Sequence, residues 1–152
     1  MLKTICILIG LASAALAADP FYLGTWKIES ASVAPWADAA RKPDREEMKS
    51  LVGKSVVIKA GEITGPQQLA CKGPKYGVKS YPADMLFQGA FGEMKRRDKT
   101  VNPAKIADAL GFHGSSWKTL ETGCGNELDF HFLDPTTFAF GLNDYVYKLK
   151  KE

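Results

Sequence analysis

Strict alternation of apolar and polar residues near the C-terminus constrains the fold more than any other feature of this sequence. Residues 127–132, 137–142 and 145–150 each place an apolar side chain at every second position, which is the pattern of a β-strand with one buried face. Asp134-Pro135 and Asn143-Asp144 separate the three runs, and both pairs are typical of turns. The sequence therefore predicts an antiparallel meander of three short strands.

More strands are predicted before this meander. Residues 116–122 form a candidate fourth strand, and Gly61-Glu62 resembles a hairpin turn. The other strand patterns, of which the last two are weaker, cover residues 22–33, 55–60, 67–71 and 77–81.

Two short helices interrupt the strands. Asn102 and Pro103 are suited to start a helix over residues 104–110, and Gly111 is suited to end it. Residues 43–51 are expected to form a second helix, and residues 83–88 a single helical turn. The fold class is therefore mainly β, either an antiparallel up-and-down barrel of about eight strands with one or two short helices, or a sandwich. We favour the barrel, because closure removes exposed strand edges.

Residues 1–17 have the composition of a signal peptide. Lys3 precedes the apolar stretch from Ile5 to Leu16, and Ala15-Leu16-Ala17 matches a signal-peptidase site. The stretch is too short to span a bilayer, so we expect no stable membrane insertion. We predict a secreted or periplasmic protein with one β-barrel domain over residues 18–152, and we expect a monomer.

Removal of the predicted signal peptide also changes the number of cysteines in the mature protein. Of the three cysteines, Cys6 lies within the leader, which leaves Cys71 and Cys124. Two cysteines in an oxidising compartment can pair in one way, and such a disulfide contributes roughly 4 kcal/mol. Redox or metal chemistry is the alternative interpretation, although neither cysteine belongs to a CxxC motif.

Gly24-Thr25-Trp26, close to the predicted mature N-terminus, resembles the G-x-W motif of the first strand of lipocalins. The resemblance implies a barrel in which Trp26 packs under a basic side chain from a late strand, for which Lys148 and Lys150 are the candidates. Two features depart from the family. The lipocalin T-D-Y motif is not matched in place, and the clearest predicted helix precedes the final meander instead of following the last strand.

Catalytic, cofactor and metal motifs are absent from the sequence. It contains neither a G-x-S-x-G nucleophile motif nor a phosphate-binding loop, and we predict no enzymatic activity, cofactor or metal. The net charge of +3 is too small to favour nucleic acid. His131 alternates with Phe130 and Phe132, so we expect it on a solvated strand face, although that face could hold a metal. The basic residues 95–99 are expected in a solvated loop, with an anionic partner as the alternative.

Aromatic residues outside the strand pattern are the candidate ligand-binding residues. Aromatic side chains at a barrel mouth bind apolar or ring-shaped ligands, and they alternatively cap the ends of the core. The candidates are Trp36, Tyr76, Tyr81, Phe87, Phe91 and Trp117.

The predicted function is therefore the binding of a small apolar or amphipathic ligand outside the cytoplasm. The alternative is a protein–protein module, such as a periplasmic inhibitor of an envelope-directed hydrolase. In that case the segment 72–81, next to Cys71, would insert into the cleft of its partner.

Overall fold

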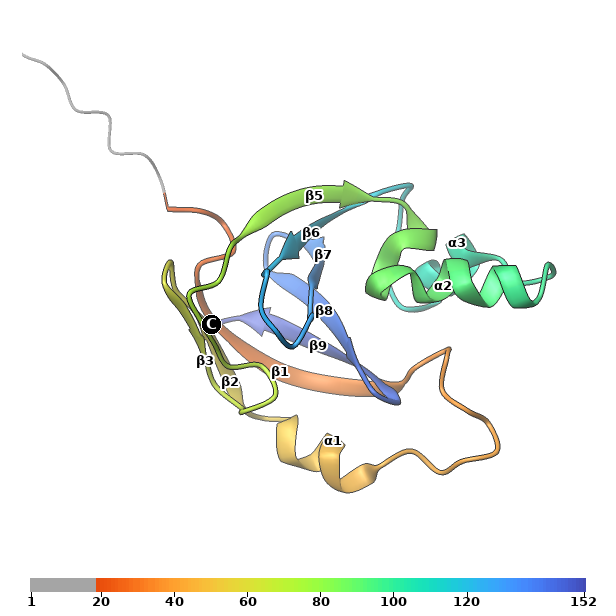
Figure 1. Cartoon of the computed structure of the whole chain (residues 1–152), viewed down its shortest axis with the longest axis horizontal. Helices are drawn as coiled ribbons and strands as arrows, with labels where there is room; N and C mark the ends of the chain where they lie inside the picture. The colour runs from red at the N-terminus through yellow and green to blue at the C-terminus, as the bar shows by residue number, and fades with distance from the viewer. Residues whose placement is uncertain (1–18) are drawn as a thin grey trace, which may run out of the picture.

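Nine antiparallel strands form one strongly curved sheet, a half-barrel, in the computed structural model, which describes residues 19–152 (Figure 1). The predicted signal peptide, residues 1–17, lies outside the described residues. The strands are β1 (Gly24–Val33), β2 (Ser55–Ile58), β3 (Glu62–Thr64), β4 (Cys71–Lys72), β5 (Gly77–Tyr81), β6 (Trp117–Glu121), β7 (Phe130–Asp134), β8 (Thr137–Leu142) and β9 (Tyr145–Lys151). The helices are α1 (Arg45–Leu51), a 3₁₀ turn η1 (Ala83–Met85), α2 (Leu86–Arg97) and α3 (Pro103–Ala109). The mainly β class is confirmed, with nine strands and three short helices.

The predicted meander is confirmed as β7-β8-β9. The strand order is β4-β3-β2-β1-β9-β8-β7-β6-β5. Within it, β8 pairs antiparallel with β7 and with β9. Asn143 adopts a φ of 49° in the two-residue turn between β8 and β9, a conformation that asparagine tolerates better than most residues. Strand β1 then pairs with both β9 and β2, so the first and last strands lie side by side at the middle of the sheet.

Local backbone geometry shortens two of the predicted strands. Glu127 has a φ of 56°, which is incompatible with a strand, and β7 therefore begins only at Phe130. The N–H groups of Leu69 and Ala70 both donate to the carbonyl of Pro66, at 2.9 and 3.0 Å. Residues 67–70 are consequently a turn, and β4 contains two residues.

Side-chain caps begin the two predicted helices. Asn102 Oδ1 accepts hydrogen bonds from the N–H groups of Ala104 and Lys105, at 3.0 and 3.3 Å, and α3 starts there as predicted. Asp44 Oδ1 caps α1 in the same way. Capping of this kind satisfies N–H groups that have no partner within the helix.

Helix α2 is longer than the helical turn predicted for residues 83–88. Its start is irregular, because Phe87, Gln88 and Gly89 have φ values of 51°, 54° and 79°, and a regular helix resumes after them. The basic residues 95–97, which were expected in a loop, form its last turn instead. There they complement the partial negative charge of the helix C-terminus.

The inner face of the half-barrel is filled by aromatic side chains. Trp26 and Phe130 both pack against Phe138, with ring centroids 4.7 Å apart in each case, and Phe140 stacks on Tyr147 at 5.0 Å. All five side chains are at most 1% exposed. The inward positions of β7, β8 and β9 thus form a packed core, as the alternation predicts.

A second core lies on the outer face of β6–β9, beneath α2 and α3. Figure 1 shows these helices beside the half-barrel and not inside it. The buried residues of this outer core are Ala34, Ala83, Leu86, Phe87, Phe91, Ala107, Phe112, Trp117, Ala139 and Val146. Both faces of this part of the sheet are therefore buried, so its outward positions are not solvated.

Lys151 occupies the position beside Trp26 that the lipocalin resemblance assigns to Lys148 or Lys150. Its Nζ lies 5.3 Å from the ring centroid of Trp26, and Trp26 pairs with Lys151 in the register of β1 and β9. The expectation for Lys148 and Lys150 was wrong, because Lys151 lies one position after Lys150 and three after Lys148. In β9 the buried series is Tyr145, Tyr147 and Leu149, and Lys151 continues it, whereas Lys148 and Lys150 have the opposite parity.

A disulfide between Cys71 and Cys124 is present, as predicted. Cys71 lies in edge strand β4, and Cys124 follows β6 in the chain. Close by, the N–H of Lys75 donates to the carbonyl of Thr122 at 2.8 Å. The disulfide therefore links edge strand β4 to the loop that follows β6, the strand next to the opposite edge of the sheet.

We expect Cys71→Ser to lower the free energy of unfolding by about 4 kcal/mol, because the bridge joins residues 53 positions apart. Denaturant unfolding under oxidising conditions measures this change. Reductant should lower the stability of the wild type to that of the variant and leave the variant unchanged. Equal stability of the two proteins without reductant would contradict the expectation.

Candidate functional site

A pocket of about 340 Å³ opens where β6 and β7 separate. The two strands pair only through Thr119–His131 and Leu120–Phe130, and they diverge beyond these pairs. The lining residues are Phe21, Ser116, Trp117, Lys118, Phe132, Leu133, Asp134 and Pro135. Phe132 belongs to the inner core and Trp117 to the outer core, so the pocket passes between the strands and does not lie on one face of the sheet.

The aromatic walls of this β6–β7 pocket are held in place by surrounding contacts. Phe21 packs edge-on against Phe132, with ring centroids 4.9 Å apart. Trp117 Nε1 donates to the carbonyl of His113 at 3.2 Å, and its ring packs edge-on against Phe112 at 5.6 Å. A pocket preformed by packed side chains is typical of small-molecule sites.

Two charged side chains lie at the same pocket, Lys118 and Asp134. Lys118 Nζ lies 5.1 Å from the ring centroid of Phe21. Asp134 Oδ1 accepts hydrogen bonds from the N–H and hydroxyl of Thr136, at 2.7 and 2.8 Å. Burial alone would raise the pKa of Asp134, but hydrogen bonds from Thr136 and Thr137 outweigh it and hold the pKa below its usual value. Asp134 is therefore an ionised carboxylate engaged in its own turn.

Trp117 is the one predicted ligand-binding residue that lines this pocket. Trp36, Phe87 and Phe91 pack together on the same outer side of the sheet, with centroids 5.3 to 6.0 Å apart. Phe87 and Phe91 are 3% and 0% exposed. These three aromatic residues thus contribute to the outer core, as the core-capping alternative predicts.

Tyr76 and Tyr81 lie elsewhere. Tyr76 packs against Tyr22 at 5.1 Å and donates its hydroxyl to the carbonyl of Lys59, and burial raises the pKa of Tyr76 to about 12. The hydroxyl of Tyr81 is hydrogen-bonded to Glu121. Glu121 also pairs with Lys79 at 2.8 Å. The structure therefore does not gather the six aromatic candidates around one cavity.

The segment 72–81, the candidate insertion loop, is bonded along its length to the half-barrel. The N–H of Gly73 donates to the carbonyl of Gly61 at 2.9 Å, and that of Lys75 donates to Thr122. Residues 77–81 form β5, which pairs with β6 over all five positions. The insertion of this segment into a partner stays a prediction.

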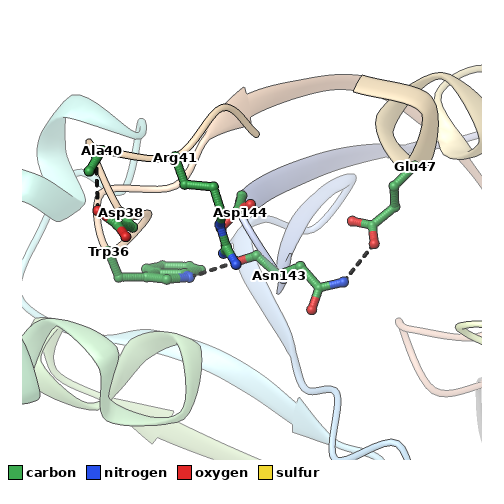
Figure 2. A network of polar contacts seen from close by, with 7 residues as sticks. All are labelled: Trp36, Asp38, Ala40, Arg41, Glu47, Asn143 and Asp144. Atoms are coloured by element: carbon green, nitrogen blue, oxygen red, sulfur yellow. Dashed lines mark hydrogen bonds and ion pairs between the residues drawn. The ribbon is translucent and has the colours of Figure 1, made fainter. Parts of the chain in front are cut away.

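Trp36 is anchored by a polar network at the turn between β8 and β9 (Figure 2). Its Nε1 donates to the carbonyl of Asn143 at 2.9 Å, and Arg41 pairs with Asp144 at 2.9 Å. Asn143 Nδ2 in turn donates to Glu47 of α1 at 2.6 Å. These contacts fix the long connection between β1 and α1 to the β8–β9 hairpin and hold Trp36 against the sheet.

Gly141 makes room for Trp36. A Cβ at position 141 would lie 2.8 Å from two ring carbons of Trp36 and 3.2 Å from the Phe87 ring. We expect Gly141→Ala to lower the free energy of unfolding by about 1–3 kcal/mol through overpacking. Gly61→Ala is the matched control, because a Cβ there meets no atom within 4 Å. Equal melting temperatures of the two variants would contradict the steric explanation.

His131 is buried, at 1% exposure, and its expected position on a solvated face was wrong. Its Nε2 accepts the N–H of Phe87 at 2.9 Å, and its Nδ1 lies 2.8 Å from Thr119 Oγ1. These bonds assign a neutral imidazole with the proton on Nδ1. The face opposite Phe130 and Phe132 is polar in sequence, but α2 covers it. His131 thus joins β6, β7 and α2 and holds the left-handed backbone of Phe87.

We expect stability to fall below about pH 6.5. Burial lowers the pKa of His131 to about 3, so the unfolded chain takes up this proton at higher pH than the folded one. The free energy of unfolding should then decrease by up to about 1.4 kcal/mol per pH unit as the pH falls below 6.5. Denaturant titrations between pH 7 and 5 measure the slope.

His131→Gln should flatten this slope, although the variant is less stable overall. His113→Gln is the control for loss of an exposed histidine, because His113 lies in a loop, where its Nδ1 is 2.6 Å from Asp108 Oδ1. A slope unchanged in His131→Gln would assign the pH dependence to other groups.

Sequence reasoning missed most of the residues lining the β6–β7 pocket. The alternation of side chains along β6 gave one indication of the pocket. It places Lys118 on the same strand face as Leu120, which is an inner-core residue. Lys118 is nevertheless exposed, because the pairing of β6 with β7 ends at Thr119. No local sequence pattern predicts that β6 and β7 diverge, because the divergence depends on how many residues of the two strands pair.

No protein family model, no curated protein and no solved structure matches the chain. Within residues 19–152, no group of three or more His, Cys, Asp or Glu side chains is arranged to hold a metal ion. Among the helices of this part of the chain, none is long and apolar enough to cross a membrane.

Proposed function

We propose that the protein binds a small apolar or amphipathic ligand in the pocket between β6 and β7. The observation that carries the proposal is the pocket itself: the apolar side chains of Phe21, Trp117, Phe132 and Leu133 line an open pocket between two diverging strands. Its volume of about 340 Å³ lies within the range of small-molecule sites. The charged groups at the same pocket would orient a ligand that has a polar end.

The proposal places the ligand between strands and not in the barrel interior. Lipocalin-like barrels hold a ligand inside the barrel, and the curved antiparallel sheet with Trp26 beside Lys151 supports a relation to such barrels. Among the described residues, however, the inward aromatic side chains pack against one another. The β6–β7 pocket is the better candidate, because its walls face open space.

The same proposal includes a secreted or periplasmic location. The disulfide between Cys71 and Cys124 supports it, because such bonds persist in oxidising compartments. The composition of residues 1–17 supports it independently. Cell fractionation with mass determination tests this part of the proposal. The protein should be found in the periplasm or the medium, without residues 1–17.

We expect octan-1-ol, a neutral amphiphile, to bind in the β6–β7 pocket. Titration should shift the amide resonances of Phe132 and Leu133, and calorimetry gives the dissociation constant. Ser116→Phe should weaken binding about tenfold by filling the pocket, a loss of about 1.4 kcal/mol. Ser116 is exposed, so the variant should still fold.

Ser32→Phe is the matched control, because Ser32 is exposed on β1 and does not line the pocket. Shifts confined to other parts of the molecule, or equal affinities of the two variants, would contradict this site. Absence of binding by the wild type would favour the alternative role as a protein–protein module.

A further inference from the structure

Lys118 brings a positive charge to the β6–β7 pocket. It is the only basic residue among those that line the pocket. The ion pairs within residues 19–152 do not include it. Its Nζ lies instead over the ring of Phe21, 5.1 Å from the centroid. Lys118 is exposed, so an ion pair that it forms with a ligand stays partly solvated.

Asp134 is the other charged residue of the pocket lining, and its carboxylate keeps its negative charge. Asp134 is engaged by Thr136 through its Oδ1 and makes no ion pair with Lys118. Lys151 adds a second positive charge behind the same wall, because its Nζ donates to the carbonyl of Phe21 at 2.7 Å. Lys151 does not line the pocket itself, so Lys118 is the ammonium that a ligand there would meet.

We propose that the ligand of this pocket is a small amphipathic carboxylate whose anionic group pairs with Lys118. Its apolar chain then lies between Phe21, Trp117, Phe132 and Leu133. This inference rests on the proposed function, since it specifies the chemical class of ligand for the same site. Lys118 acts here as the residue that determines specificity for charge.

The geometry favours a singly charged group over a phosphate. A lysine is a single compact charge, whereas phosphate sites typically add arginine forks or several backbone N–H groups. The pocket lining contains no arginine. A carboxylate matches one ammonium in charge and is small enough to leave most of the pocket to the apolar chain.

Three probes of equal chain length test the inference: octanoate, octan-1-ol and octylammonium, titrated by calorimetry into the wild-type protein at neutral pH. We expect octanoate to bind about fivefold more tightly than octan-1-ol, which corresponds to a partly exposed ion pair. Octylammonium should bind more weakly than both. Added salt should reduce the advantage of octanoate.

Lys118→Met should abolish the preference for octanoate over octan-1-ol, whereas Lys118→Arg should retain this preference. Lys105→Met, which removes one exposed positive charge from α3, is the control for net charge. Equal binding of octanoate and octan-1-ol, or a preference that survives in Lys118→Met, would overturn the inference and leave the proposed function intact. Failure of all three probes to bind would overturn both.

Discussion

Helix α2 and Trp36 can pack against the sheet because the outer face of β8 carries almost no side-chain bulk. Phe138 and Phe140 point inward, and between and after them lie Ala139 and Gly141. The Trp36 ring would collide with any Cβ at position 141. The alternation of large and small residues in one strand therefore lets a single layer of sheet serve two cores. The helices, the long connection after β1 and the wall of the β6–β7 pocket all depend on the second core.

His131 belongs to β7, in the part of the sheet that separates the inner core from the outer core. Its two ring nitrogens bond to β6 and to the start of α2, while its neighbours Phe130 and Phe132 fill the interior. Left-handed φ values at Phe87 and Gln88 are costly for residues with side chains. A buried acceptor for the Phe87 N–H offsets part of this cost, and the packing of the Phe87 ring against His131 at 4.8 Å contributes further.

Local signals in the sequence were sufficient for the meander, the capped helix α3 and the disulfide. They failed where tertiary contacts decide. The alternation predicts that His131 and Phe130 lie on opposite faces of the sheet. It does not predict whether the face that carries His131 is exposed to solvent or covered by a helix. Helix α2 was missed because the irregular turn at Phe87–Gly89 interrupts its pattern. The pocket was missed because it follows from the pairing of β6 and β7 over only two positions. The parity of Lys118 with Leu120 was the one clue present in the sequence.

The three tryptophans occupy three separate environments. Trp26 lies in the inner core beside Lys151, Trp36 lies on the outer face above Gly141, and Trp117 lines the β6–β7 pocket. Each indole N–H donates to a backbone carbonyl of a different segment, namely those of Tyr22, Asn143 and His113. The chain therefore carries three indole fluorophores in different surroundings. Variants that retain one tryptophan at a time would report separately on the interior, the helical layer and the pocket without any attached dye.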